Sequence, residues 1–370
     1  MFHAYSHRYG AMRVVRLGSV QTSFRDRHGL TGEHLMPTSG LVRELGTLRA
    51  RWRDHQWSGP ERAALISAIA ISLAALFVTT YSLALGHPVP HGIPIAIVGN
   101  PDTPSAAMDA VTQVAVAPKF QRYDSLASAR EAIDWQQVYA ALDLTGAQPT
   151  LYIASASSAV LARTLERAST FDPGLRIIDT HPLNANDPNG VDVFYLMLGT
   201  TILGFSGTFQ VRSNAKPLSL PEWCAFVLQQ AFAGGLVLTL VAGPVLRRLA
   251  LPVGEGWAIL TLQLIATASF ASLMSVLIGR WAILPTWLFF VVLGNSSSGG
   301  VVAPPLLPPV LAFFSQWLPS GSTVTALRNA VYFPGYQHIH PLAVLFAWAF
   351  GLFIAMIVAS HVRGTSPGEP

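Results

Sequence analysis

Charged residues and cysteine are scarce in this chain of 370 residues. Only 11% of its residues are charged, whereas soluble globular proteins average about 25%. With 51% hydrophobic residues and a mean hydropathy of +0.43, the composition excludes an ordinary soluble domain and indicates an integral membrane protein. The single cysteine, Cys224, excludes an internal disulfide and lies in an apolar segment, where we expect it to pack as a small side chain.

Motifs that carry chemistry are also missing. No G-x-x-x-x-G-K-[ST] run is present, so the chain has no P-loop with which to bind ATP, and no segment resembles a nucleic-acid-binding module. No G-x-S-x-G surrounds Ser155, Ser157 or Ser158, and we interpret Ser157 as a helix cap. His338 and His340 are two candidate metal ligands without a third, which favours an interfacial loop. We therefore expect no enzyme, cofactor or metal site.

Basic residues are concentrated at the N-terminus. Ten of the 23 Lys and Arg residues lie in residues 1–62, which predicts a cytoplasmic basic tail, with Met12 and Met36 as alternative starts. Within it, the apolar periodicity of residues 41–53 predicts an amphipathic helix on the membrane surface; a solvated basic linker is the alternative. The short tail 363–370 is placed on the same cytoplasmic side by counting crossings.

Six apolar segments predict an α-helical polytopic membrane protein. The first helix, 63–86, contains 23 consecutive uncharged residues from Ala64, enough to cross a hydrocarbon core of about 30 Å. A five-helix membrane domain is expected over 191–362, with spans at about 193–211, 223–246, 257–279, 282–296 and 341–361. No charged residue lies in the middle of a span, which disfavours a proton- or sodium-coupled carrier. Arg247 and Arg248 fall outside in this topology, against the positive-inside rule.

Residues 87–190 differ in composition from the rest and follow the first span. They contain ten acidic and six basic residues, which predicts one small extracytoplasmic domain in a multi-pass protein of the cell membrane. Short β-branched or alternating runs predict strands, and Ser125 and Ser157 are placed as caps of two helices. The strands are expected at 93–99, 120–124, 138–144, 150–154 and 176–181, with a hairpin turn at 144–149. Strands interleaved with helices indicate an α/β domain.

The segment 293–334 interrupts the fifth apolar run. Glycines and serines follow directly on Leu293, and the prolines of 304–309 exclude one continuous helix. We expect short re-entrant or interfacial helices over about 304–334, at 310–318 and 323–332, with Ser322 as a cap. We define the predicted mouth as the residues expected to line a path or a docking surface at the outer face: Asn295, Ser296, Ser297, Ser298, Gly299, Gly300 and Arg328. A simple Gly/Ser-rich exit from a helix is the alternative.

This layout, together with the run LGNSSSGG and the later WLP and ALRNAVYF elements, resembles the ABC-2-type permease superfamily over residues of about 60–362. Within it, the chain is most similar to the phage-infection-protein-like and nitrosoguanidine-resistance-type membrane proteins of actinobacteria. The resemblance implies an export-related or envelope-associated membrane protein whose ATPase, if it has one, is a separate chain. It also implies membrane lipids as partners and transport between the helices of a homodimer.

Two functions remain open at the level of sequence. The first is a permease subunit that exports a lipid-like or amphiphilic compound. The second is a non-transporting envelope protein whose outer domain binds a partner or supports assembly of a surface or secretion apparatus. The loop at about 212–222 bears on the choice, because a permease needs a coupling helix there and Pro217 and Pro221 interrupt it.

Overall fold

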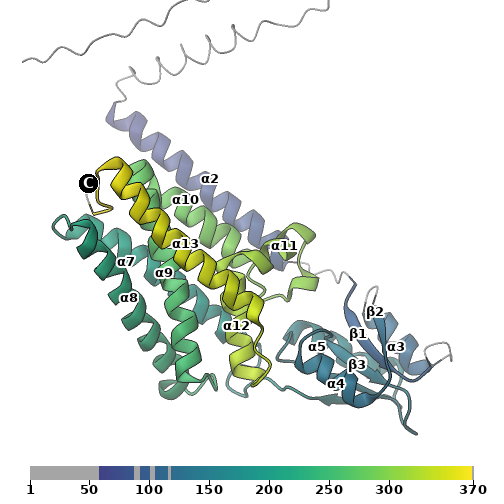
Figure 1. Cartoon of the computed structure of the whole chain (residues 1–370). Helices are drawn as coiled ribbons and strands as arrows, with labels where there is room; N and C mark the ends of the chain where they lie inside the picture. Colours follow the sequence, from purple (N-terminus) through teal and green to yellow (C-terminus); the bar gives the residue numbers. More distant parts are fainter. Residues whose placement is uncertain (1–57, 87–91, 101–104, 116–117, 369–370) are drawn as a thin grey trace, which may run out of the picture. The chain divides into compact units, whose positions relative to one another are not determined.

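The structure is a computed structural model that describes residues 58–86, 92–100, 105–115 and 118–368 (Figure 1). It divides into two units, 1–64 and 65–370. The described part of the first unit, 58–64, contains the first turns of α2 (Gly59–Leu85), the helix predicted as the first span. The amphipathic helix predicted for 41–53 lies outside the described residues.

The region after α2 forms the predicted α/β domain, and all five predicted strands are confirmed. Its strands are β1 (Pro94–Val98), β2 (Lys119–Tyr123), β3 (Ala140–Asp143), β4 (Thr150–Ile153) and β5 (Arg176–Asp179). They form one mixed sheet in the order β2-β1-β3-β4-β5, in which only the β3–β4 pair is antiparallel. The turn at 144–149 is therefore a hairpin, as predicted.

Helices cover both faces of this sheet, because alternate strand residues point to opposite sides. On one face, Ile95, Leu142 and Leu151 belong to a core shared with α3 (Ala106–Val114), α5 (Ala159–Glu166) and α6 (Ala168–Phe171). On the other face, Ala96 and Ala141 pack with α4 (Leu126–Asp134). The first core also contains Val302, Leu306 and Leu307, which fasten the domain to the chain segment after the predicted mouth.

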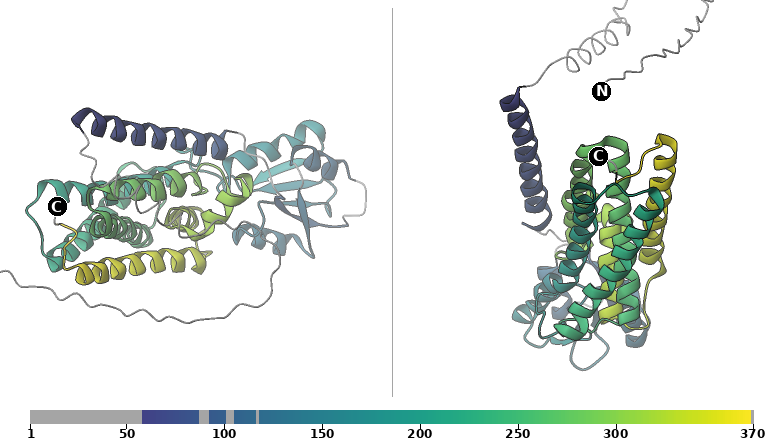
Figure 2. Two further views of the ribbon diagram at one scale, coloured as in Figure 1. Left: turned by 90° about the horizontal axis from the view of Figure 1, so that it is seen from above. Right: turned by 90° about the vertical axis from the view of Figure 1, so that its left-hand side faces the viewer.

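The remaining long helices run side by side in one bundle (Figures 1 and 2). In this bundle α9 packs against three other long helices. Their bounds are α7 (Asp192–Asn214), α8 (Leu220–Leu240) continued by a π-helical turn (Val241–Val245), α9 (Val253–Ile278) and α13 (Ile339–Arg363). After α9 the chain turns at Gly279 and returns through a 3₁₀ turn (Gly279–Ala282), α10 (Ile283–Trp287) and a π-helix (Leu288–Asn295).

Four helical ranges are long and apolar enough to cross a membrane: Gly59–Leu85, Leu220–Val245, Val253–Asn295 and Ile339–Arg363. The chain is therefore mostly helical and fits a membrane protein. The third range holds two of the predicted spans, separated by the turn at Gly279. The helix α7, predicted as the second span, has 23 residues but does not reach the same apolarity. Six spans remain a prediction.

The segment after the π-helix contains short helices, as predicted. They are a 3₁₀ turn (Pro304–Leu306), α11 (Pro309–Trp317) and α12 (Pro319–Tyr332). The second of these short helices was predicted to start at Thr323 with Ser322 as its cap. This prediction is wrong, because α12 already begins at Pro319 and Ser322 is buried inside it. A proline is well suited to the first helical position, where its missing N–H costs no hydrogen bond.

Two helix caps were predicted in the α/β domain. One is correct, and the other lies one residue away from the predicted position. Ser125 caps α4 by accepting a hydrogen bond from the Ser128 backbone N–H. The cap of α5 is Ser158 and not Ser157, because the Ser158 hydroxyl accepts the Leu161 N–H at 3.2 Å. Residue Ser157 is 5% exposed, and its hydroxyl has no hydrogen-bond partner among the described residues.

Candidate functional site

The predicted mouth begins with three serines that turn back onto their own helix. The Ser296 hydroxyl donates to the Val292 carbonyl at 2.5 Å, Ser297 to Leu293 at 2.7 Å and Ser298 to Asn295 at 2.8 Å. These bonds satisfy carbonyls that the end of a helix leaves without a backbone partner. Asn295, Ser296 and Ser297 are buried and do not line the cavity described below. The geometry of these three residues fits the alternative prediction, a simple Gly/Ser-rich exit from a helix.

Arg328 reaches the two glycines that follow the serines. Its Nη2 donates to the carbonyl of Gly299 at 3.1 Å and to that of Gly300 at 3.4 Å. Gly299 has a φ of +74°, which L-residues with a side chain rarely adopt, and a Cβ on Gly300 would lie 2.8 Å from Phe194 Cβ. The glycines thus permit the close approach that turns two carbonyls toward Arg328.

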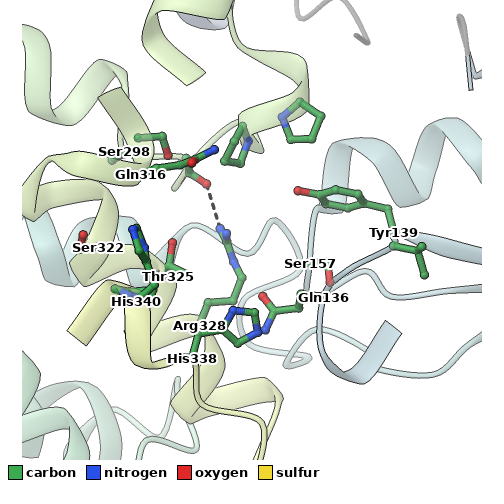
Figure 3. A pocket seen from close by; sticks show the side chains of 16 residues that line it. Gln136, Tyr139, Ser157, Ser298, Gln316, Ser322, Thr325, Arg328, His338 and His340 are labelled. Atoms are coloured by element: carbon green, nitrogen blue, oxygen red, sulfur yellow. Dashed lines mark hydrogen bonds between the residues drawn. The ribbon is translucent and has the colours of Figure 1, made fainter. Parts of the chain in front are cut away.

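A cavity of about 440 Å³ lies between the α/β domain and the helices of the membrane region (Figure 3). The α/β domain contributes Gln136, Val138, Tyr139 and Ser157 to its lining. The other lining residues follow the π-helix: Ser298, Gly299, Pro304, Pro305, Ser315, Gln316, Ser322, Thr325, Arg328, His338, His340 and Pro341. Of the predicted mouth, the cavity therefore includes Ser298, Gly299 and Arg328, while Gly300 lies in a smaller adjoining hollow with Arg328.

The helix that carries Arg328 is held firmly in the bundle. Gln263 of α9 donates to the Thr201 hydroxyl of α7 at 3.0 Å and accepts from the Thr323 hydroxyl of α12 at 3.0 Å. All three side chains are buried, so the hydrogen bonds between them fix α12 against two neighbouring helices. Arg328 lies five residues after Thr323 and reaches the cavity from this anchored helix (Figure 3).

On the domain side, α4 ends in a way that aims one side chain at α12. Gln136 follows the last turn with a φ of +51°, a left-handed conformation that commonly ends helices but is uncommon for residues other than glycine or asparagine. Its Nε2 donates to Asn329 Oδ1 at 2.5 Å. Next to it, the ring of Trp135 contacts Tyr336 edge-on with centroids 5.1 Å apart, and lies 5.8 Å from His338. The domain is thus attached directly beside the cavity.

The lining of the cavity mixes apolar residues with hydroxyl, amide and basic side chains, and it contains no acidic side chain among the described residues. Arg328 is permanently charged, and no carboxylate of the described residues lies within the 4.0 Å of an ion pair with it. Burial raises the pKa of Tyr139 to about 12, despite the nearby charge of Arg328, so its hydroxyl stays neutral and can donate a hydrogen bond. The electrostatics of this site therefore favour an anionic group.

Sequence reasoning found part of this lining. Arg328 and the Ser/Gly run were singled out, whereas Gln136 and Tyr139 carry no local signal, because tertiary packing alone brings them there. His338 and His340 both line the cavity, yet the described residues contain no group of three His, Cys, Asp or Glu side chains that could hold a metal ion.

Comparison of the chain with protein-family models, with curated proteins and with solved structures finds no match.

Proposed function

We propose that this chain is the membrane subunit of an ABC-2-type permease-like exporter, which moves a lipid-like or amphiphilic compound with a separate ATPase. The observation that supports this best is the cavity beside the end of the π-helix Leu288–Asn295, whose lining combines apolar residues with Arg328 and several hydroxyl side chains. Polar, non-helical chain near a bilayer is tolerated where it lines a wet cavity or is buried in protein. Such a cavity beside an interrupted span is suited to receive the head group of an amphiphile.

The direction of the helices also supports this proposal. Arg212 at the end of α7 donates to the Gly279 carbonyl, and Arg363 at the end of α13 donates to the Val276 carbonyl at 2.8 Å. These ends therefore lie together, opposite to the α/β domain that precedes α7. Successive long helices alternate in direction, which is the arrangement that six spans with both termini on one side require.

One observation favours the second candidate, an envelope protein that binds a partner through its outer domain. The chain between α7 and α8, residues 215–219, is exposed and contains no helix, and α8 begins with a capping box between Ser219 and Glu222. A permease of this type is expected to present a coupling helix to its ATPase at this loop. An ATPase partner would therefore have to contact the non-helical loop 215–219 directly.

An accumulation assay tests the proposal. Cells that lack the chain are complemented with the wild type, with a variant that has residues 215–219 replaced by Gly and Ser, or with vector, and loaded with a panel of fluorescent amphiphiles. Lower accumulation with the wild type, abolished by ATP depletion but not by a protonophore, is the expected result. The loop variant should insert normally and fail to export.

A second measurement locates the energy source. Because the chain has no P-loop, the purified polypeptide should not hydrolyse ATP by itself. ATP hydrolysis by the pure chain, or equal accumulation of every amphiphile with wild type and vector, would contradict the proposal. In the latter case the envelope function, tested by crosslinking from the α/β domain in intact cells, would be favoured.

A further inference from the structure

The charge of Arg328 in the cavity has no counterion among the described residues. Both hydrogen bonds of Arg328 to the protein use Nη2, so that Nε and Nη1 have no partner among the described residues. A guanidinium that is partly buried without an opposite charge is unfavourable, and removal from water increases its attraction to an anion. The two glycine carbonyls hold the group in place but do not neutralise it.

Buried hydroxyls around the same space also lack partners. Ser157 and Ser322 line the cavity and are 5% and 2% exposed, yet neither hydroxyl has a hydrogen-bond partner among the described residues. The Nε2 atom of His338, another lining residue, is likewise buried and unpaired. Buried polar atoms in proteins are nearly always hydrogen-bonded, so these three unpaired atoms favour a polar partner in this space.

The arrangement of these donors favours a phosphate over a carboxylate. Ser157 belongs to the α/β domain, Arg328 and Ser322 to α12, and His338 precedes α13, so the donors approach from separate elements (Figure 3). A phosphate offers three or four oxygens in different directions and accepts a bidentate hydrogen bond from arginine. The N-terminus of the 25-residue α13, beside His338, adds a favourable dipole for an anion.

We infer that this cavity binds a phosphate group, with Arg328 as its principal ligand and with Ser157, Ser322 and His338 as further hydrogen-bond donors. A space of about 440 Å³ is larger than one phosphate requires, so it has room for the remainder of a head group. Since donors come from both sides, the bound phosphate would also join the α/β domain to α12. The idea that the phosphate belongs to a transported cargo rests on the permease proposal. Binding of the phosphate itself can be measured without transport.

The test measures binding to the purified full chain in neutral detergent. The probes are inorganic phosphate, a short-chain phosphatidic acid and a diacylglycerol of the same chain length that lacks the phosphate, at constant ionic strength. Calorimetry gives affinities, and thermal unfolding reports stabilisation by the ligand. Phosphatidic acid should bind and raise the unfolding temperature, and the diacylglycerol should not. Binding of inorganic phosphate as well would identify the phosphate alone as sufficient.

Variants assign the binding to this cavity. Arg328→Gln should weaken it by about tenfold or more, since a charged hydrogen-bonding partner is removed. Arg328→Lys should retain part of the affinity, because the charge remains and the bidentate geometry is lost. Arg280→Gln is the matched control, because Arg280 lies after α9, at the end of the bundle opposite to the cavity, and should leave the affinity unchanged.

Ser157→Ala keeps the test decisive if Arg328→Gln does not fold. The Ser157 hydroxyl makes no hydrogen bond within the described protein, so its removal should leave the unfolding temperature without ligand unchanged or higher, and lower the affinity several-fold. If neither phosphate probe binds to the wild type, or if Arg328→Gln and Ser157→Ala both bind as tightly as the wild type, the inference is wrong. Either result would leave the permease proposal open, because the accumulation assay does not depend on phosphate.

Discussion

Gly321 lies at the corner between α11 and α12, where there is no room for a side chain. A Cβ at this position would be 1.9 Å from the backbone oxygen of Ser315. Because the obstacle is backbone and not the end of a flexible side chain, the helices would have to move apart. The corner also orients α12, and with it Arg328. The absence of a side chain at Gly321 therefore helps to set the position of Arg328 in the cavity.

We predict that Gly321→Ala destabilises the protein by about 3 kcal/mol or more, through overpacking at a site that cannot relax. The unfolding temperature in detergent, followed by fluorescence-detected size exclusion, measures this effect. Gly351→Ala in α13 is the matched control, because nothing lies within 4 Å of its Cβ and alanine has the higher helix propensity. An unchanged unfolding temperature for Gly321→Ala would show that the corner is not as tight as described.

His181 lies where the α/β domain packs against the end of α12, and its titration leads to a prediction about pH. Its ring stacks on Phe333 with centroids 4.5 Å apart, and its Nε2 lies 3.4 Å from Asp134 Oδ1. Burial lowers the pKa of His181 below its usual 6.5 and outweighs the carboxylates of Asp134 and Asp179, which raise it, while Arg130 lowers it further. The folded protein thus binds protons at His181 less readily than the unfolded chain does.

It follows that the contribution of His181 to stability is present above its ordinary pKa and is lost as the pH falls toward the lowered folded-state value. We expect the unfolding temperature of the wild type to drop as the pH falls below about 6.5, the ordinary pKa of histidine. In His181→Gln the drop should be smaller, because the titrating group is gone. An equal drop in both proteins would mean that other groups carry the pH dependence.

At the scale of elements, residues 296–307 lead from the π-helix to α11 and pack Val302, Leu306 and Leu307 against the α/β domain. The glycines of this segment belong to the predicted mouth, so leucine in place of Gly299 and Gly300 should abolish function by filling it. The contacts add a second effect, since a side chain at Gly300 displaces Phe194 of α7 and any L-residue at Gly299 is strained. We expect the double variant to insert into the membrane, to lose function and to unfold at a lower temperature.

Immunoblots of membrane fractions, unfolding temperature and amphiphile accumulation measure these three outcomes. Gly199→Leu in α7 is the matched control, because its Cβ meets nothing within 4 Å. Full activity of the Gly299 and Gly300 double variant would contradict a role for this segment in function.

Local signals in the sequence were sufficient for most elements and insufficient for the cavity. The strands were predictable because short β-branched runs end at turn residues, and α4 because Ser125 is a good cap. The cap of α5 was missed because Ser157 and Ser158 are equivalent by local sequence. The pairing of Gln136 with Asn329 joins residues 193 positions apart, and no periodicity encodes such a contact. Residues with a local pattern were therefore found, and residues placed by tertiary packing were not.

At the scale of the whole molecule, the distribution of arginines predicts the orientation in the membrane. Arg212 and Arg363 lie at the end of the bundle away from the α/β domain. Arg247 and Arg248 are the exceptions to the positive-inside rule. Arg248 forms an ion pair with Asp192 through both Nε and Nη2, so its charge is largely compensated, and Arg247 is left as the exception. Apart from Arg247, the bias agrees with the basic tail in predicting that the N-terminus lies inside.

We therefore predict that residues 87–190 face the outside and the loop 215–219 the cytoplasm. The carboxylate of Asp143 accepts hydrogen bonds from the backbone and hydroxyl of Thr145, so the exposed Ala147 in the same hairpin is the better position for a reporter cysteine. With Cys224 replaced by alanine, Ala147→Cys should react with an impermeant maleimide in intact cells. Lys216→Cys, also exposed but beyond the opposite end of α7, should react only after the cells are broken.

Labelling of Lys216→Cys but not Ala147→Cys in intact cells would show that the orientation is the reverse of the predicted one. Labelling of both would mean that α7, whose 23 residues extend about 34 Å, does not cross the membrane.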